Sequence, residues 1–216
     1  MDKKTNPLNI KKIALLSKPI GSKPLKQILI GKDVNLSSKW TNPVNGSVEW
    51  SSDRGVSPVD YGPIKVGWFG TEIQTSCIPF DSTNVDISTE IFYFPSSNDQ
   101  MYEIDIFGFD KNGIEKFWIA ITDYERLNYF PTLYVRVNFN ELYNKLYYGH
   151  NQINKIVISK RNNIFKLINN ESVLVDTVIE NVLLDIDKVV IKFSRFQSYN
   201  ALYNMGVSEI IIESFE

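Results

Sequence analysis

The run KIVISKRNNIFKLINNESVLVDTV, residues 155–178, decides the fold of this chain. It alternates short β-branched and aromatic runs with the polar turns RNN (161–163) and NNE (169–171). The same kind of run returns in VVIKFSRF (189–196) and VSEIIIESF (207–215). Strand-sized runs separated by turn residues at this spacing are typical of an antiparallel β-sandwich. We therefore expect an all-β fold.

Similar strand candidates occupy the middle of the chain. They are KQILI (26–30), a short run at 48–50, IKVGWFG (64–70), STEIFYF (88–94), MYEIDIFGF (101–109), IEKFWIAIT (114–122) and TLYVRVNF (132–139). Asn112-Gly113 separates two of these runs. Asn-Gly is the typical pair of a type I′ hairpin turn, because both central residues of that turn need a positive φ. The sequence therefore predicts a hairpin over residues 101–122.

One segment predicts a short helix instead. Its apolar residues recur at i, i+3, i+4, i+7 and i+8, which would place them on one face of an α-helix. These residues are Phe139, Leu142, Tyr143, Leu146 and Tyr147. Gly149 follows at a position suited to end the helix. We expect one short helix packed on the sandwich.

Composition and charge limit the classes of function. The 216 residues are 43% hydrophobic, and a net charge of −2 with a pI of about 5.6 provides no basic field for nucleic acid. The single cysteine, Cys77, cannot form an internal disulfide and is expected to be a small buried hydrophobe. One Cys and one His offer no clustered zinc ligands, and no phosphate-binding glycine motif occurs. We therefore expect no metal, no cofactor and no nucleic-acid partner.

The chain divides by composition into two parts. We expect residues 1–60 to form an extended arm and loop-rich anchoring segment, and residues 61–216 to form the β-sandwich domain. The arm carries prolines that work against regular structure. Its lysines are Lys3, Lys4, Lys11, Lys12, Lys18 and Lys23. We interpret them as an assembly arm that packs on another chain, and a solvated flexible tail is the alternative.

The N-terminal region does not resemble a targeting signal. Its apolar stretch, residues 13–16, is shorter than the roughly 7–15 apolar residues of a secretory signal. No run in the chain approaches the ~20 apolar residues of a membrane-spanning helix. The abundance of Asn, Ile, Lys, Tyr and Phe indicates an AT-rich genome, as phages and viruses of AT-rich hosts commonly have. We expect a protein that is made in a host cytoplasm, without a signal peptide or a membrane partner, and that is located in a virion.

Two carboxylates are the strongest catalytic candidates. The period of a strand puts Glu103, Asp105 and Phe107 on one face. Glu103-Ile104-Asp105-Ile106 resembles the start of the motif in jelly-roll endo-β-glucanases and carrageenases, where a glutamate, an aspartate and a second glutamate alternate along a strand. The resemblance implies a nucleophile at Glu103 and an assisting carboxylate at Asp105. Because Phe107 stands where the acid/base glutamate would fall, we expect no catalytic site.

Aromatic residues in and beside loop-rich sequence are the remaining binding candidates. Flat rings beside amides and carboxylates serve both sugar sites and protein interfaces, whereas core packing under long loops is the alternative. The candidate carbohydrate-binding residues are Trp40, Trp50, Tyr61, Trp68, Tyr199 and Tyr203.

The C-terminal strands resemble the later strands of concanavalin A-like or laminin G-like domains. Asn169-Asn170 stands where those domains often have an Asn-Gly turn, and residues 207–215 match the closing strand. The resemblance covers residues 60–216 and implies a jelly-roll sandwich. The metal-binding residues of those domains have no clear counterpart in this sequence.

These features favour a non-enzymatic structural protein of a phage or virus, such as a capsid decoration, head-fibre or tail component. Its arm would hold it to other virion proteins within a larger oligomeric assembly. The alternative is a carbohydrate-binding, lectin-like module that contacts host or surface glycans. The third hypothesis is a jelly-roll glycosidase that uses Glu103 and Asp105.

Overall fold

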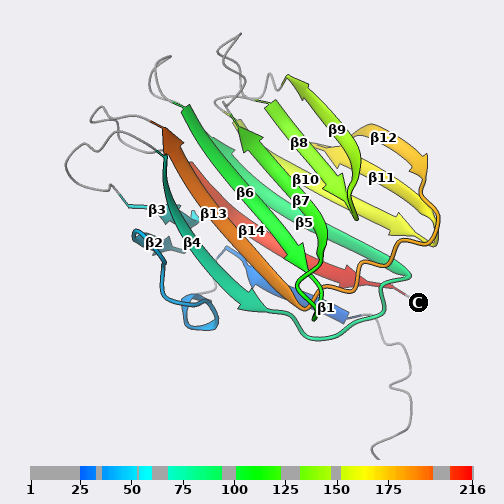
Figure 1. Ribbon diagram of the computed structural model, residues 1–216, viewed down its shortest axis with the longest axis horizontal. Helices are drawn as coiled ribbons and strands as arrows, with labels where there is room; N and C mark the ends of the chain where they lie inside the picture. Colours follow the sequence, from blue (N-terminus) through cyan, green and yellow to red (C-terminus); the bar gives the residue numbers. More distant parts are fainter. Residues whose placement is uncertain are drawn as a thin grey trace, which may run out of the picture.

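The computed structural model shows two antiparallel β-sheets stacked as a sandwich (Figure 1). It describes residues 25–32, 36–52, 54–59, 68–93, 101–122, 132–146, 152–196 and 205–215. Within these ranges the helical structure is limited to one 3₁₀ turn, Ser37–Lys39. No helix in the described part is long and apolar enough to cross a membrane. The all-β antiparallel sandwich predicted from the sequence is confirmed, and the six arm lysines lie outside the described residues.

The larger sheet has eight described strands in the order β12-β11-β10-β5-β14-β3-β2, with β1 also paired to β14. Its strands are β1 (Leu25–Ile30), β2 (Val48–Ser51), β3 (Gly55–Pro58), β5 (Asn84–Tyr93), β10 (Gln152–Arg161), β11 (Ile164–Asn169), β12 (Ser172–Val178) and β14 (Met205–Ser214). All of its pairings are antiparallel. Residues 155–178 therefore form most of β10 together with β11 and β12, at one edge of this sheet.

The smaller sheet lies in front of the larger one in Figure 1 and has six described strands in the order β4-β13-β6-β7-β8-β9. Its strands are β4 (Trp68–Ser76), β6 (Met101–Phe109), β7 (Glu115–Thr122), β8 (Thr132–Val137), β9 (Asn140–Leu146) and β13 (Lys188–Phe196). β6, β7, β8 and β9 follow one another as hairpins, so residues close in sequence become neighbours across the face.

Alternation along the strands builds the core between the two sheets. On β6, Ile104 and Ile106 are buried, and on β10, Ile156 and Ile158 are buried. Each such side chain contributes about 1.5–3 kcal/mol relative to leaving it in water. A register slip of one residue would turn these side chains outward, so burial fixes the pairing of the strands. Cys77 is also buried, as predicted.

The predicted helix over residues 139–147 is wrong as far as the structure describes it. Asn138 and Phe139 have φ angles of 45° and 65° and form a tight turn that folds β9 back on β8. Leu142 has no partner in the register, because a bulge falls at this point, so Leu142 and Tyr143 both pack against the core. Because the bulge allows two adjacent apolar residues to face the core, the apolar spacing of this strand matches the period of a helix.

The predicted hairpin over residues 101–122 is confirmed as β6 and β7, but its turn is not of type I′. The N–H of Gly113 donates to the carbonyl of Asp110 at 2.9 Å, and Gly113 has a φ of 77° whereas Asn112 does not have a positive φ. Asp110 Oδ1 also accepts from the N–H groups of Asn112 and Ile114, at 2.8 and 2.9 Å. A longer loop with a bulge therefore replaces the two-residue turn.

The predicted domain boundary at residue 60 does not match the strand pairing. β1, β2 and β3 come from the segment assigned to anchoring, yet they pair within the larger sheet. Trp40 from the same segment is part of the hydrophobic core. In the described residues the sandwich therefore begins at Leu25, because its first strand finds its partner in the last strand, β14.

Candidate functional site

Four aromatic side chains form a row on the outer face of the six-stranded sheet. We name them the aromatic strip: Phe107 and Phe109 on β6, Trp118 on β7 and Tyr134 on β8. The ring centroids of Phe109 and Phe107 are 5.8 Å apart, those of Phe107 and Trp118 are 5.5 Å apart, and those of Trp118 and Tyr134 are 4.6 Å apart. All four side chains are half-buried, so each ring keeps part of its surface in solvent.

Strand register brings the strip together. Phe107 on β6 lies opposite Trp118 on β7, and Trp118 lies opposite Arg136 on β8. Tyr134 lies opposite the small Ala120, which leaves room for its ring to reach Trp118 diagonally. Inward residues occupy the alternate positions, so the aromatic side chains all face away from the core.

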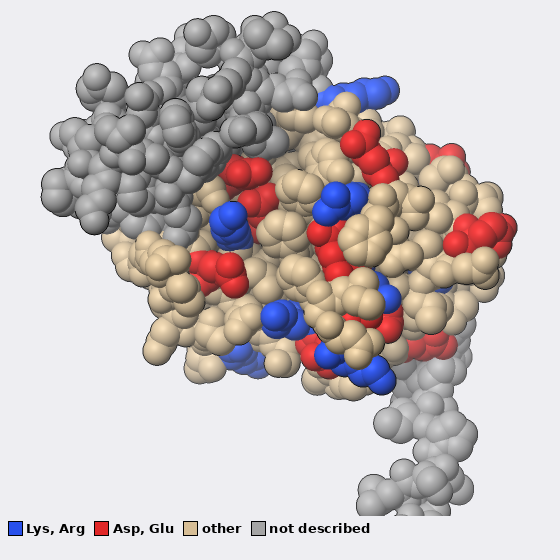
Figure 2. Space-filling view, in the orientation of Figure 1, with Lys and Arg blue, Asp and Glu red and all other residues tan. Residues whose placement is uncertain are grey.

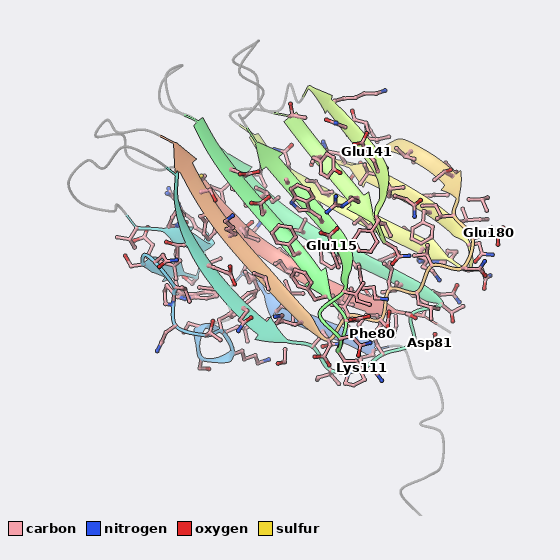
Figure 3. The ribbon with its side chains drawn as sticks, in the orientation of Figure 1. Phe80, Asp81, Lys111, Glu115, Glu141 and Glu180 are labelled. Atoms are coloured by element: carbon pink, nitrogen blue, oxygen red, sulfur yellow. The ribbon has the colours of Figure 1, made fainter. Side chains whose placement is uncertain are left out.

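Two cations lie beside the strip, Arg136 near Trp118 and Lys188 near Phe109. Arg136 donates from Nε and Nη2 to the two carboxylate oxygens of Glu115, at 2.8 and 2.7 Å. Glu115 is labelled in Figure 3, at the start of β7. This two-bond pairing holds the guanidinium carbon 4.8 Å from the centroid of the Trp118 ring. Lys188 Nζ lies 5.4 Å from the centroid of the Phe109 ring.

Asp105 lies beneath the strip and holds the indole of Trp118. Its Oδ1 accepts a hydrogen bond of 2.8 Å from Trp118 Nε1, and only 3% of the residue is exposed. Burial raises the pKa of Asp105 to about 7, the charge of Glu103 adds to the rise, and the Trp118 bond and Lys192 oppose it. Burial also raises the pKa of Glu103 above its usual range. We infer that Asp105 orients Trp118 and does not itself face a ligand.

This arrangement suits a ligand that has both apolar faces and hydroxyl groups. The half-exposed rings offer flat apolar contact, and the charged side chains around them offer hydrogen-bond donors and acceptors. Figure 2 shows the same face with positive and negative side chains interspersed among uncharged ones. No single sign of charge dominates the view, so the strip suits a polar, uncharged ligand better than a polyanion.

The structure places only part of the predicted aromatic set. Trp40 is 7% exposed, its Nε1 donates to the carbonyl of Leu29 at 3.0 Å, and its ring lies 6.0 Å from that of Trp50. Trp40 is therefore a core residue whose ring has no face free for a sugar. Trp50 is half-buried, packs against the core and lines a pocket of about 100 Å³ together with Ile30 and Leu36. Only the backbone of Trp68 is described, at the start of β4.

The other three predicted residues, Tyr61, Tyr199 and Tyr203, lie outside the described residues. Glu103 and Asp105 share the outer face of β6, as the alternation predicted, while Ile104 and Ile106 point into the core. Sequence reasoning recognised Phe107 as their neighbour but did not extend the face across the sheet. The Asn112-Gly113 turn was the sequence signal that could have identified Trp118 as part of this face. Pairing residues 101–109 with 114–122 across that turn places Phe107 opposite Trp118.

Metal ligands do not gather in the part of the chain that the structure describes. Among those residues, no group of three or more His, Cys, Asp and Glu side chains is placed to hold a metal ion. The pairing of Asp105 with Trp118 and of Glu115 with Arg136 engages two of the carboxylates beside the strip.

No protein-family model matches the sequence, and no curated protein matches it. Solved structures do match. The CBM2 module of the evolved Dit of Lactobacillus casei BL23 phage J-1 has a TM-score of 0.60 and 13% sequence identity, over 89% of this chain and 97% of that one. A lectin from Bauhinia forficata in complex with GalNAc has a TM-score of 0.55 and 12% identity, over 89% of this chain and 98% of the lectin.

The Ca²⁺-bound exoplasmic/lumenal domain of VIP36 matches with a TM-score of 0.55 and 13% identity, over 88% of this chain and 90% of that domain. Sequence identities this low establish the fold alone, because one fold carries many functions. The chain therefore has the concanavalin-like, jelly-roll β-sandwich fold that its C-terminal strands predicted.

Proposed function

We propose that this chain is a non-enzymatic, carbohydrate-binding structural module of a phage or viral particle, and that the aromatic strip contacts the glycan. The observation that carries the proposal is the row of four half-exposed rings on one sheet face, with Arg136 beside Trp118 and Lys188 beside Phe109. Rings stacked against sugar faces supply apolar contact, and the surrounding polar groups supply direction.

The virion part of the proposal has two supports. One structural neighbour is a CBM2 module of a phage Dit. The N-terminal segment, residues 1–24, is rich in lysine and proline, which suits an extended arm that pairs with acidic groups on another protein. In this proposal, the arm tethers the sandwich to a virion protein after synthesis in the host cytoplasm, and the strip faces outward to the host surface.

A non-enzymatic role agrees with the chemistry of β6. Asp105 is buried, has a pKa of about 7 and is bonded to Trp118, so it is a poor partner for a nucleophile at Glu103. Phe107 occupies the position where the related glycosidase motif has its acid/base glutamate. We expect no polysaccharide cleavage by the wild-type protein, and measurable cleavage that is lost in Glu103→Gln would overturn this part of the proposal.

The glycan-binding test compares two tryptophans. Trp118→Ala should weaken binding to glycans that the wild-type protein retains on a glycan array by about tenfold or more, because a central ring carries much of the affinity of such sites. Trp50→Ala is the matched control, since Trp50 lies on β2 in the other sheet and lines a separate pocket. Melting temperatures of both variants separate lost contact from lost fold.

Three outcomes would contradict the proposal. Wild-type protein that binds no glycan on the array would remove the carbohydrate-binding function. Loss in Trp50→Ala with normal binding in Trp118→Ala would move the site to the pocket beside Trp50. For the arm, deletion of residues 1–24 should abolish incorporation into particles without changing the melting temperature, and normal incorporation of the deleted protein would exclude tethering by the arm.

A further inference from the structure

Phe139 is an exposed aromatic residue in a backbone conformation that disfavours it. It is the second residue of the β8–β9 turn, with a φ of 65° after the 45° of Asn138. A tight turn with two positive φ angles favours glycine at such a position, because a Cβ atom crowds the backbone there. Phe139 is 64% exposed, so the fold leaves most of this residue in solvent.

The turn itself does not require an aromatic ring. The β11–β12 turn has nearly the same geometry, with φ angles of 45° at Asn170 and 70° at Glu171. Glu171 is exposed and polar, as expected for a turn residue without a packing role. A phenylalanine in the equivalent position therefore adds an exposed apolar ring without improving the turn. Residues held in such conformations are often retained for contacts with a ligand.

The contacts of Phe139 connect it to the aromatic strip. The guanidinium carbon of Arg136 lies 5.9 Å from the centroid of the Phe139 ring and 4.8 Å from that of Trp118. Because Arg136 is bonded to Glu115 through both carboxylate oxygens, its position between the two rings is fixed. The Phe139 ring therefore lies on the strip side of the sheet, next to Arg136 at the end of β8.

We propose that Phe139 is a further ligand-contacting residue and that it selects extended oligosaccharides over single sugars. Neighbouring strands lie about 4.8 Å apart, so the row from Phe109 on β6 to the turn beyond β8 spans about 10–15 Å. That span exceeds one sugar ring and matches a chain of several. This inference rests on the proposed function of the strip and adds the class of ligand, a glycan chain that crosses the strands.

The test uses three variants and a series of ligand lengths. Phe139→Ala removes the ring and keeps a Cβ atom in the turn, whereas Phe139→Gly removes both. Glu171→Gly is the matched control, because it relaxes the same kind of turn on the other sheet. The probes are cello-, malto- and chito-oligosaccharides of one to six units, measured together with the glycans retained by the wild-type protein on an array.

We expect both Phe139 variants to bind the longest oligosaccharide that the wild-type protein recognises about tenfold more weakly, with unchanged binding of its mono- or disaccharide. Phe139→Gly and Glu171→Gly should each raise the melting temperature by about 2–4 °C, because the strained residue is relieved. Glu171→Gly should leave all binding unchanged. Phe139→Gly would therefore gain stability while losing affinity, which a purely structural residue would not do.

The possible failures are distinguishable. If Trp118→Ala loses binding while both Phe139 variants bind every length normally, the inference about Phe139 is wrong and the proposed function stands. If the Phe139 variants weaken short and long ligands equally, the residue does not select length, and the claim about extended chains fails. If the wild-type protein binds no glycan of any kind, the proposed function fails and this inference falls with it.

Discussion

Asp105→Asn should make the protein more stable at alkaline pH. The folded state holds the pKa of Asp105 at about 7, against 3.8 for the free side chain, chiefly because the carboxyl is buried. At about 1.36 kcal/mol for each tenfold change in the dissociation constant, this difference corresponds to about 4 kcal/mol. Because the folded state binds the proton more tightly, the wild-type protein loses this stability as the pH rises from about 4 to about 7.

Asparagine keeps the geometry while removing the charge. Its side-chain oxygen accepts the hydrogen bond from Trp118 Nε1, so the indole stays in place. We expect the urea midpoint of the wild-type protein to decrease as the pH is raised from 4.5 to 8.5. The decrease should be about 1–2 M smaller for Asp105→Asn. The pH dependence of the urea midpoint that remains in Asp105→Asn should come from Glu103, because burial also raises the pKa of Glu103.

Two further measurements define the result. The carboxyl carbon shift of Asp105, followed by NMR across the same range, should titrate near pH 7. Trp118→Phe deletes the hydrogen bond that lowers the pKa of Asp105, so Asp105 should titrate at a higher pH in this variant. Urea midpoints of the wild-type protein and Asp105→Asn that change in parallel over the whole range would refute the reasoning, because they would show that Asp105 ionises in the folded state as it does in the unfolded state.

Two other predictions concern the packing of the sandwich. Gly108→Ala should lower the free energy of unfolding by about 3 kcal/mol, because a methyl group there would overlap the buried ring of Phe117. Gly113→Ala should lower it by only about 1 kcal/mol, because the φ of Gly113 is 77° but its added methyl group would meet no atom within 4 Å. Equal melting temperatures of the two variants would contradict this prediction. Burial raises the pKa of the Cys77 thiol to about 12, so iodoacetamide at pH 8 should modify it only in urea, and rapid modification of the folded protein would show that the thiol is accessible.

The error at residues 139–147 shows where pattern reasoning fails on this chain. Leu142 and Tyr143 are adjacent apolar residues, and a regular strand would send one of them to solvent. The bulge opposite Val135 and Arg136 lets both pack inward, so the spacing matched a helix without forming one. A bulge depends on the partner strand, and the partner is not visible in the local pattern.

The prediction of a binding role for Trp40 failed for a related reason. Trp40 lies in loop-like sequence, which suggested exposure, but its ring is covered once β1 pairs with β14 at the far end of the chain. Phe107, Trp118 and Tyr134 lie in strand candidates and were not among the predicted binding residues, yet all three point outward from the six-stranded sheet. Loop or strand context alone does not tell which face a ring occupies.

The sequence by itself determined most of the strand positions, though not those of β3 and β9, together with the inward and outward alternation on β6 and the concanavalin-like sandwich. Local period and turn residues are encoded within a few positions of each other. Only the tertiary structure decided that Leu25 begins the sandwich, that Trp40 is core, and that rings from β6, β7 and β8 form one strip with Arg136. These features depend on which strands become neighbours and in what register. Strand pairing is a long-range outcome of burying the whole core at once, so it can be observed in the folded chain but not within any one segment.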